Sequence, residues 1–397
     1  MQVAIIGGGI GGLVAALSLL KLGIDVSIYE QTPVLQEVGA GLQLSANASR
    51  VLFWLGLRDK LLDMGSLPID KEIRLWTSGA SWKVPGTGAA SEERYGAPFL
   101  AVHRADLQNL LVKTLEAIKP GCIRLSSRCV SVAETDQKVR LDFADGSTVA
   151  VDCLIGADGV HSVVRNCVHL DSHPEFTGLV AWRGVVETSR LDMEAFGSAS
   201  SNWIGPGCHL ITYPLRGGTL LNFVGIVRRA EWEQENWSLV GSQEELLADF
   251  SGWHEHVQAV IREIKQPLKW AMVKRKPLAH WSHGRITLLG DACHATLPFL
   301  GQGAGMAIED GAVLARCLAA TPQDTAAALK TYEALRVERT ATIVDRSTAI
   351  LPRFQNPILA NEDEARRYVT KQWDEATVAA TYDWIYSYDA TTLPLAS

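Results

Sequence analysis

The chain has 397 residues, of which 47% are hydrophobic and 20% are charged, and this predicts a globular protein with a large core and room for two domains. The formal net charge of −7 argues against nucleic acid as a partner, because phosphate backbones are bound by clustered lysines and arginines. No apolar run reaches the roughly 20 residues that a membrane-spanning helix needs, so we expect no membrane partner.

The first predicted elements are a strand, a glycine turn and a helix. Residues 1–6 indicate a buried strand, and Gly7, Gly9 and Gly12 follow it in the spacing Gly-x-Gly-x-x-Gly. The first glycine allows a tight turn, the second lets the backbone approach a pyrophosphate, and the third lets the helix over residues 13–22 pack on the strand. The pattern predicts a dinucleotide site at the helix N-terminus, where free N–H groups face phosphate.

A second strand and an acidic residue complete this unit. Gly23 suits the end of the helix, residues 24–29 indicate a strand, and Glu30 follows directly. An acidic side chain at this place accepts hydrogen bonds from ribose hydroxyls and repels a 2′-phosphate. The order of these elements favours dinucleotide binding over a glycine turn that binds nothing.

The second motif follows a buried strand over residues 151–157. Asp158 and Gly159 come directly after it, and Arg165 follows near the start of a helix. Gly159 permits a sharp turn, and Asp158 and Arg165 are placed to lock the turn and to face phosphates. An Asp-Gly pair alone indicates only an ordinary turn, so this motif gains its weight from positions 158–165 taken together.

The third motif follows another buried strand, over residues 285–289. It places Asp291 at the carboxyl end of that strand, in the crevice of an open α/β sheet where ligands bind. Residues 298–306 then form a glycine-rich stretch ahead of a helix expected from Ala307. Backbone N–H groups at that helix start are placed to stabilise negative charge on a reduced flavin ring.

The middle of the chain is rich in β-branched and aromatic residues. Residues 68–99 indicate strands and loops, and residues 171–279 indicate a β-rich region. Within that region we expect strands over residues 179–186, 209–214 and 220–227, a hairpin turn over 214–219, and one amphipathic helix over 243–264.

Seven cysteines are scattered along the chain without a Cys-x-x-Cys pair, a pattern typical of reduced thiols in a cytoplasmic protein. We therefore expect a cytoplasmic protein, either a monomer or a homodimer. His254-x-His256 has no further ligands nearby that complete a metal site, so we interpret it as a solvated helix face and expect no metal.

Together the three motifs resemble those of single-component flavoprotein aromatic hydroxylases, the class A FAD-dependent monooxygenases. The resemblance covers residues 1–345 and implies an α/β fold in which a Rossmann-like FAD-binding domain of the glutathione-reductase type is interleaved with a mostly antiparallel substrate sheet. The expected boundaries are 1–67, 100–170 and 280–345 for the FAD-binding domain, 68–99 and 171–279 for the substrate domain, and 346–397 for a helical C-terminal tail.

The resemblance also implies cofactor residues. Glu30 is expected on the ribose, Arg104 on FAD, Asp291 on the ribityl chain, and the loop over residues 37–44 beside the flavin ring. The full set of expected FAD-binding residues is Gly7, Gly9, Gly12, Glu30, Ala40, Gly41, Arg104, Asp158, Arg165, Asp291, Pro298, Gly301, Gly303, Ala304 and Gly305. Since no second Gly-x-Gly-x-x-Gly occurs, NADH or NADPH is expected to reduce FAD transiently and to leave.

Within this class the chain resembles salicylate hydroxylases and 3-hydroxybenzoate 6-hydroxylases through Trp182-Arg183-Gly184 and the run from Tyr213 to Gly218. His209 matches the active-site base of the latter enzymes, and a histidine titrates near the pH at which a phenol proton must be removed. Tyr213 leaves the same strand face and either orients the substrate or simply packs. Pro298 stands where some of those enzymes have a glutamine, which leaves the hydroxylated position open.

The implied activity is the NAD(P)H- and O₂-dependent hydroxylation of a small phenolic aromatic carboxylate, of the salicylate or 3-hydroxybenzoate type, through a flavin C4a-hydroperoxide. Two alternatives stay open. One is a 6-hydroxynicotinate-type hydroxylase, since those enzymes share the run from Gly290 to His294. The other is a flavin-dependent reductase or dehydrogenase of an apolar ligand.

Overall fold

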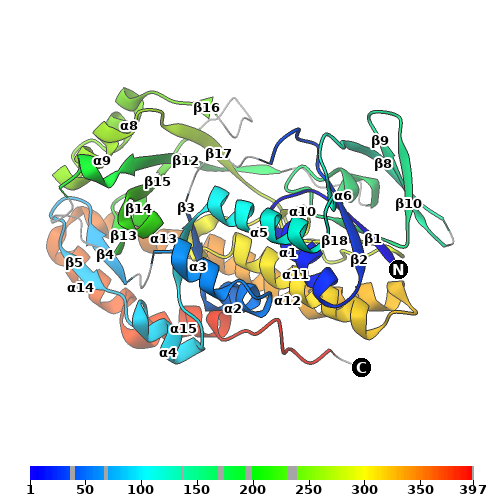
Figure 1. The fold of residues 1–397 in the computed structure, drawn as a ribbon. Coiled ribbons are helices and arrows are strands. Elements are labelled where there is room, and N and C mark those ends of the chain that lie inside the picture. Colours follow the sequence, from blue (N-terminus) through cyan, green and yellow to red (C-terminus); the bar gives the residue numbers. More distant parts are fainter. Residues whose placement is uncertain are drawn as a thin grey trace.

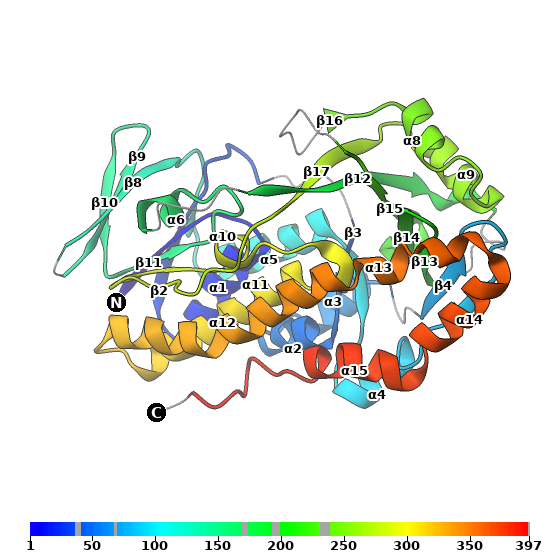
Figure 2. The same cartoon turned by 180° about the vertical axis from the view of Figure 1, so that it is seen from behind.

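The computed structural model describes residues 1–35, 41–66, 70–135, 137–168, 174–192, 199–230 and 239–395. The protein is a mixed α/β structure in which a parallel sheet and a larger mixed sheet lie toward opposite ends of the molecule (Figure 1). Helices α11 (Gly303–Ala320) and α12 (Thr325–Ala349) extend along the molecule between these ends, as the reverse view also shows (Figure 2).

Five strands form the parallel sheet, in the order β18-β11-β1-β2-β7. Their bounds are Gln2–Ile6 for β1, Asp25–Tyr29 for β2, Ile123–Arg124 for β7, Cys153–Gly156 for β11 and Ile286–Leu288 for β18. The strands predicted at 1–6, 24–29, 151–157 and 285–289 are therefore confirmed. Because β1, β11 and β18 are neighbours, the three sequence motifs that follow them lie side by side at one edge of the sheet.

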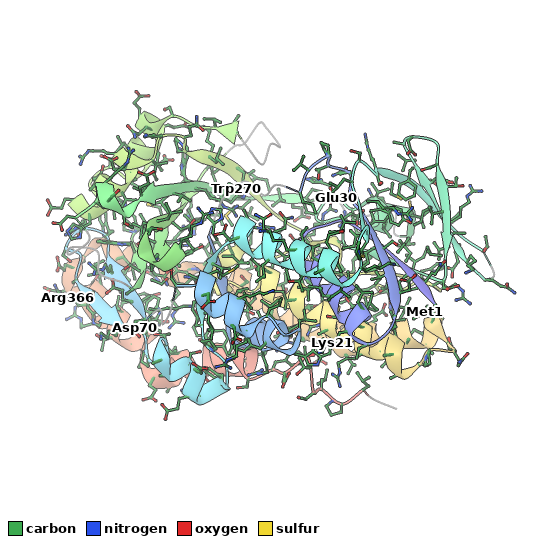
Figure 3. All side chains as sticks on the ribbon, viewed as in Figure 1. Met1, Lys21, Glu30, Asp70, Trp270 and Arg366 are labelled. Carbon is green, nitrogen blue, oxygen red and sulfur yellow. The ribbon has the colours of Figure 1, made fainter. Side chains whose placement is uncertain are left out.

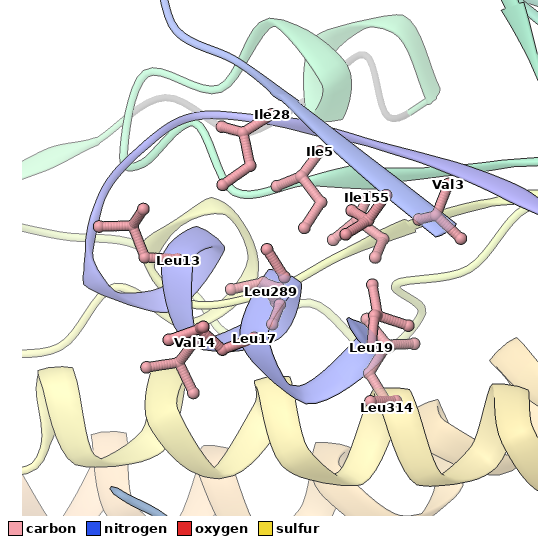
Figure 4. Packing of buried hydrophobic residues seen from close by; sticks show 14 of the residues in the cluster. Val3, Ile5, Leu13, Val14, Leu17, Leu19, Ile28, Ile155, Leu289 and Leu314 are labelled. Atoms are coloured by element: carbon pink, nitrogen blue, oxygen red, sulfur yellow. The ribbon is translucent and has the colours of Figure 1, made fainter. Parts of the chain in front are cut away.

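Helix α1 (Ile10–Lys21) packs between the parallel sheet and α11 (Figure 4). Its Leu17 belongs to the same buried cluster as Ile5 of β1 and Leu314 of α11. The two helices approach closely at Gly311, where a Cβ would lie 2.8 Å from the backbone nitrogen of Ala15. Small residues on both helices allow this contact.

Helix α11 begins at Gly303, four residues before the predicted start at Ala307. The reason is visible in the backbone, because the N–H of Met306 already donates to the carbonyl of Gln302 at 2.8 Å. Gly303 and Gly305, which marked this stretch as a loop, are thus part of the first helical turn.

The larger sheet has eight strands in the order β16-β17-β12-β15-β14-β13-β4-β5. Their bounds are Lys71–Leu75 for β4, Ser81–Lys83 for β5, Glu175–Glu187 for β12, Ser200–Ile204 for β13, Cys208–Leu215 for β14, Leu220–Arg228 for β15, Leu239–Val240 for β16 and Leu268–Lys274 for β17. Only the β13–β4 pair is parallel among these described strands, so the sheet is mostly antiparallel, as predicted.

The outer face of this sheet packs against two helices. Trp182 and Phe223 of the sheet share a buried cluster with Phe250 and Ile261 of the helical segment. The prediction of one helix over residues 243–264 is wrong, because the chain forms α8 (Gln243–Asp249) and α9 (Glu255–Glu263). Gly252 takes a φ of +77° between them, a left-handed conformation that continues no α-helix.

Two smaller sheets and several short helices complete the fold. Strand β3 (Gly41–Leu44) pairs with β6 (Leu100–His103), and β8 (Cys129–Glu134), β9 (Val139–Phe143) and β10 (Thr148–Val151) form an antiparallel sheet. The connecting helices are α2 (Ala46–Trp54), α3 (Arg58–Met64), α4 (Ala89–Tyr95), α5 (Arg104–Ile118), α6 (Val163–Val168) and α10 (Asp291–His294), with 3-10 turns at Thr188–Arg190, Arg216–Gly218, Pro298–Leu300 and Pro357–Ala360. Helix α4 was not predicted in the stretch 68–99.

The chain ends in helices α13 (Leu351–Phe354), α14 (Glu362–Gln372) and α15 (Glu375–Tyr386), which confirms a helical C-terminal part. They lie on the side of the eight-stranded sheet opposite to α8 and α9 (Figures 1 and 2). Helix α12 continues through residue 345, so the boundary predicted there falls inside a helix. In the part of the chain that the structure describes, no helix is long and apolar enough to cross a membrane.

Candidate active site

A cavity of about 440 Å³ lies between the motif-bearing edge of the parallel sheet and the inner face of the eight-stranded sheet. This size is within the range of small-ligand sites. Trp270, one of its lining residues, lies in the middle of the molecule, whereas Glu30 lies toward the parallel sheet (Figure 3). The predicted site residues that line it are Gly9, Gly41, Arg104, His209, Tyr213, Asp291, Pro298, Gly301, Gly303 and Ala304.

The other predicted residues do not line the cavity. They are Gly7, Gly12, Glu30, Asp158, Arg165 and Gly305. Ala40 lies outside the described residues. Among the residues that the structure describes, no group of three or more His, Cys, Asp or Glu side chains could hold a metal ion.

Two positions in the glycine turn after β1 have no room for a side chain. Gly7 takes a φ of +107°, and a Cβ there would lie 2.4 Å from the carbonyl oxygen of Ala157. A Cβ on Gly12 would lie 2.2 Å from the carbonyl oxygen of Gly7. Gly9 differs, because no protein atom lies within 4 Å of the position of its Cβ, although Gly9 lines the cavity. The fold does not require glycine there, whereas a phosphate that approaches the backbone does.

Glu30 is tied to the same turn. One carboxylate oxygen accepts the N–H of Gly8 at 2.8 Å and the other accepts the N–H of Thr32 at 2.9 Å. Each oxygen has a second lone pair, so the carboxylate keeps acceptor capacity for hydroxyl groups. The ribose contact expected of Glu30 stays a prediction.

The second motif forms a helix cap and a link to the third motif. The carboxylate of Asp158 accepts the hydroxyl of Ser162 at 2.5 Å and the N–H of Val163 at 2.7 Å, which caps α6. Burial raises the pKa of Asp158. Arg165 is buried and donates to the carbonyl of Ala292 at 3.1 Å. Arg165 therefore joins the second motif to the third from behind the cavity wall.

A buried charge network supports the third motif. Asp310 of α11 accepts the N–H of Gly290 at 3.0 Å and lies 2.6 Å from the Nε2 atom of His294. Arg336 of α12 pairs with Asp310 at 2.8 Å and with Glu309 at 2.7 Å, and all four side chains are fully buried. Burial raises the pKa of Asp310, but His294 and Arg336 together lower it to about 2. The network thus holds the turn that starts α10.

His209 of β14 lies in the cavity wall within an aromatic setting. Its ring stacks on Phe354 with a centroid distance of 5.2 Å and meets Phe299 edge-on at 5.4 Å. Its Nδ1 atom lies 3.0 Å from the side-chain nitrogen of Gln355. Burial, together with the charge of Arg228, lowers the pKa of His209 to about 3. The imidazole is therefore neutral across the physiological pH range.

Tyr213 lies on the same strand face as His209 and packs against the start of β3. A Cβ on Gly41 would lie 2.4 Å from the Tyr213 ring. The N–H of Gly41 donates to Asn222 Oδ1 at 2.7 Å, and Asn222 is the cross-strand neighbour of Tyr213. Burial raises the pKa of Tyr213, so its hydroxyl stays neutral.

Two cations that sequence reasoning did not assign to the site also line the cavity. The Nζ atom of Lys71 lies 3.9 Å from the ring centroid of Phe99, and the guanidinium of Arg183 lies 4.0 Å from that of Trp270. Among the described residues, the Lys71 ammonium has no ion pair or hydrogen bond, and burial lowers its pKa to about 7. No local sequence signal marks Lys71, because its place depends on the pairing of β4 with β13, far along the chain.

The C-terminal helices close the cavity with aromatic side chains that sequence reasoning also missed. The lining side chains from this part are Phe354, Trp373, Val378, Tyr382 and Tyr386. The sequence indicates these residues only as a cluster of aromatic residues near the end of the chain. Such a cluster does not reveal which part of the fold its side chains will contact.

Comparison with known proteins agrees with this site. The model of a family described as an FAD binding domain matches residues 1–347. The 3-amino-4-hydroxybenzoate 2-monooxygenase PtnB3 of Streptomyces platensis is 37% identical over 98% of this chain and 96% of its own. The 6-hydroxynicotinate 3-monooxygenase of Bordetella bronchiseptica (strain ATCC BAA-588 / NCTC 13252 / RB50) is 35% identical over 99% of this chain and 97% of its own. A solved salicylate hydroxylase substrate complex superposes with a TM-score of 0.80 at 29% identity, over 98% of this chain and 96% of its own.

The chain therefore belongs to the FAD-binding-domain family of flavoprotein aromatic monooxygenases. It is an oxidoreductase with FAD as its cofactor, and the class inferred from the three motifs is confirmed. The similarity to a 3-amino-4-hydroxybenzoate 2-monooxygenase was not foreseen from the sequence.

Proposed function

We propose that the protein hydroxylates a small phenolic aromatic carboxylate, of the salicylate or 3-hydroxybenzoate type, with NADH or NADPH as electron donor and O₂ as co-substrate. The observation that carries this proposal is that one cavity joins the glycine turn after β1 to the sheet face that bears His209 and Tyr213. In this proposal the parallel sheet with α1 and α11 forms the FAD-binding domain and the eight-stranded sheet forms the substrate domain.

The residues present fit FAD. The strand order around β1 is that of dinucleotide-binding sheets, and Gly9 leaves room for a pyrophosphate. Arg104, Asp291 and the N-terminus of α11 at Gly303 line the cavity, where they would hold the ribityl chain and the flavin ring. Bound and reduced FAD supplies electrons and activates O₂. The protein binds the substrate beside it, orients the ring and excludes water.

The rest of the lining suits a flat aromatic acid. Phe299 and Trp270 offer ring faces, and His209 and Tyr213 offer polar atoms for a phenolic oxygen. The Lys71 ammonium is the cation that we assign to the substrate carboxylate, because it has no ion pair or hydrogen bond among the described residues and a carboxylate would provide both.

Replacing Lys71 with methionine is expected to weaken binding of 3-hydroxybenzoate roughly 10- to 100-fold, the value of one hydrogen bond between charged groups at about 1.5–3 kcal/mol. The same change is expected to raise the stability of the ligand-free protein, because burial disfavours the charge of Lys71 and its ammonium has no ion pair or hydrogen bond among the described residues. Affinity is measured from the perturbation of the oxidised flavin spectrum, and stability from thermal unfolding.

Lys71→Arg retains the charge and is the conservative variant, and Lys83→Met on the neighbouring strand β5 is the matched control, because Lys83 is exposed. Phenol, which lacks the carboxylate, should bind wild type and Lys71→Met equally. An equal loss for phenol and 3-hydroxybenzoate would show that Lys71 does not contact the carboxylate.

The affinity for the carboxylate is expected to fall as the pH rises through about 7. Burial lowers the pKa of Lys71 to about 7 in the free enzyme, so the amine loses its charge above that pH. A bound carboxylate raises this pKa, and binding therefore takes up a proton and weakens up to tenfold per pH unit above 7. Titrations with benzoate, which carries the carboxylate but no phenol that could ionise, check this between pH 6 and 9, and Lys71→Met should show a flat profile.

The proposed function is tested by NADH and NADPH oxidation of the FAD-loaded protein in air, with and without salicylate, 3-hydroxybenzoate and 6-hydroxynicotinate. We expect one acid to stimulate oxidation strongly and to yield a hydroxylated product. The 6-hydroxynicotinate-type alternative is favoured by the similarity to a 6-hydroxynicotinate 3-monooxygenase. Stimulation without any hydroxylated product would instead support a flavin-dependent reductase.

A further inference from the structure

We propose that Gln355 is a positioning residue that holds His209 as the tautomer with its proton on Nε2, so that His209 donates a hydrogen bond to a phenolate oxygen of the substrate instead of removing the phenol proton. This inference rests on the proposed function for the identity of the substrate. It replaces the role of base that the family resemblance implies for His209.

The orientation of the Gln355 amide follows from its two neighbours. Its side-chain nitrogen lies 3.3 Å from the carbonyl oxygen of Ile226 and 3.0 Å from Nδ1 of His209. A backbone carbonyl only accepts, so the NH₂ group of the amide must face Ile226. The same NH₂ group then donates its second hydrogen to His209, and Nδ1 must accept it. A neutral imidazole that accepts at Nδ1 carries its proton on Nε2.

The surroundings of Gln355 hold its side chain in place beside His209. Its side chain is 3% exposed and directly follows α13, whose Phe354 stacks on the His209 ring. The backbone carbonyl of Gln355 accepts the N–H of Gly207 at 3.4 Å, and this hydrogen bond ties the segment to the loop before β14. Ile226 is the cross-strand neighbour of His209, so the amide bridges two adjacent strands beside the cavity.

In the proposed role His209 keeps the same protonation state throughout, whereas a histidine that acts as a base gains a proton. The ring is already neutral with a proton on Nε2, so this nitrogen has no lone pair for a phenol proton. Burial and the charge of Arg228 also disfavour the imidazolium that a base would become. The phenol proton leaves to water as the substrate binds, and the Nε2–H group then faces the phenolate oxygen. No covalent bond of His209 changes, and the ionised substrate is the form that the site selects.

The tautomer is measured directly by nitrogen-15 NMR of the histidine-labelled holoenzyme. We expect Nδ1 of His209 to resonate as an unprotonated nitrogen and Nε2 as a protonated one, with the signals assigned by their absence in His209→Gln. Gln355→Glu, which can accept from Nδ1–H, should move the proton to Nδ1. Asn356→Asp is the matched control, because this neighbouring amide caps the turn at Ile358 and does not contact His209. A proton on Nδ1 in the wild type overturns the proposal.

A second readout follows ionisation of a bound probe without turnover. The absorbance of 4-hydroxy-3-nitrobenzoate reports whether its phenol is ionised, and Gln355→Met should weaken the preference of the site for the ionised form by roughly tenfold. An unchanged preference in Gln355→Met overturns the proposal. If the probe does not bind to the wild type, the proposed substrate class fails, while the NMR result still decides the tautomer.

Discussion

Replacing Arg336 with methionine is expected to lower the free energy of unfolding by about 3–5 kcal/mol, because it leaves two fully buried carboxylates without their shared cation. Arg336 pairs with Glu309 at 2.7 Å and with Asp310 at 2.8 Å, and none of the three side chains is exposed. Methionine fills a similar volume, so the loss is electrostatic and not a cavity effect. The measurement is urea unfolding of the protein without added FAD.

The control for this prediction is Arg366→Met. Arg366 pairs with Glu362 at 2.7 Å one helical turn away, but both side chains are almost half exposed. Solvent screens such a pair, so its removal should cost about 1 kcal/mol or less. Equal costs for Arg336→Met and Arg366→Met would contradict the view that the buried network stabilises the fold.

Arg336→Met is also expected to weaken FAD binding. The carboxylate of Asp310 accepts the N–H of Gly290, which precedes Asp291 in the cavity wall. Without Arg336 this carboxylate is destabilised, and the turn that presents Asp291 is no longer fixed. A stable Arg336→Met variant with unchanged FAD affinity would show that the network does not position the third motif.

Gly12→Ala and Gly9→Ala are expected to have different effects on the free energy of unfolding. At Gly12 a Cβ would lie 2.2 Å from a backbone carbonyl oxygen, so we expect a loss of about 3 kcal/mol in unfolding free energy, the upper end for an overpacked core. At Gly9 no protein atom lies within 4 Å of the Cβ position and the φ of −70° suits alanine. Gly9→Ala should therefore leave the apoprotein unchanged or stabilise it by about 0.4–1 kcal/mol.

FAD affinity separates the two variants further. Gly9 lines the cavity, so a methyl group there should clash with the bound pyrophosphate and weaken FAD roughly 10- to 100-fold. Fluorescence titration of each refolded apoprotein with FAD provides the measurement. If Gly9→Ala binds FAD as tightly as wild type, the pyrophosphate does not lie at this turn.

The parallel sheet was predictable because each of its motifs obeys a local rule. A buried strand, a glycine turn and a helix follow one another within the first 21 residues, and the structure places β1 and α1 accordingly. Local rules also failed in places. The break at Gly252 divides a helix whose apolar pattern runs on through it, and the glycines at 303 and 305 conceal the first turn of α11.

The side of the cavity that the eight-stranded sheet forms was predictable only in part. Alternation along one strand put His209 and Tyr213 on one face, and the structure brings both into the cavity. Lys71 and Gln355 join them through strand pairing and through a helix that returns from the end of the chain. Contacts between residues more than a hundred positions apart have no counterpart in a local pattern, so these side chains emerged only from the three-dimensional structure.

The proposed reaction inserts one oxygen atom from O₂ into the ring of a phenolic aromatic acid that is bound in this cavity. The most direct measurement is turnover of the FAD-loaded protein with NADH under ¹⁸O₂, using the acid that most strongly stimulates NADH oxidation, followed by mass spectrometry of the product. The proposed reaction gives a product that carries one ¹⁸O atom on the ring. A product with oxygen only from water, or a reduced ligand without added oxygen, would contradict it.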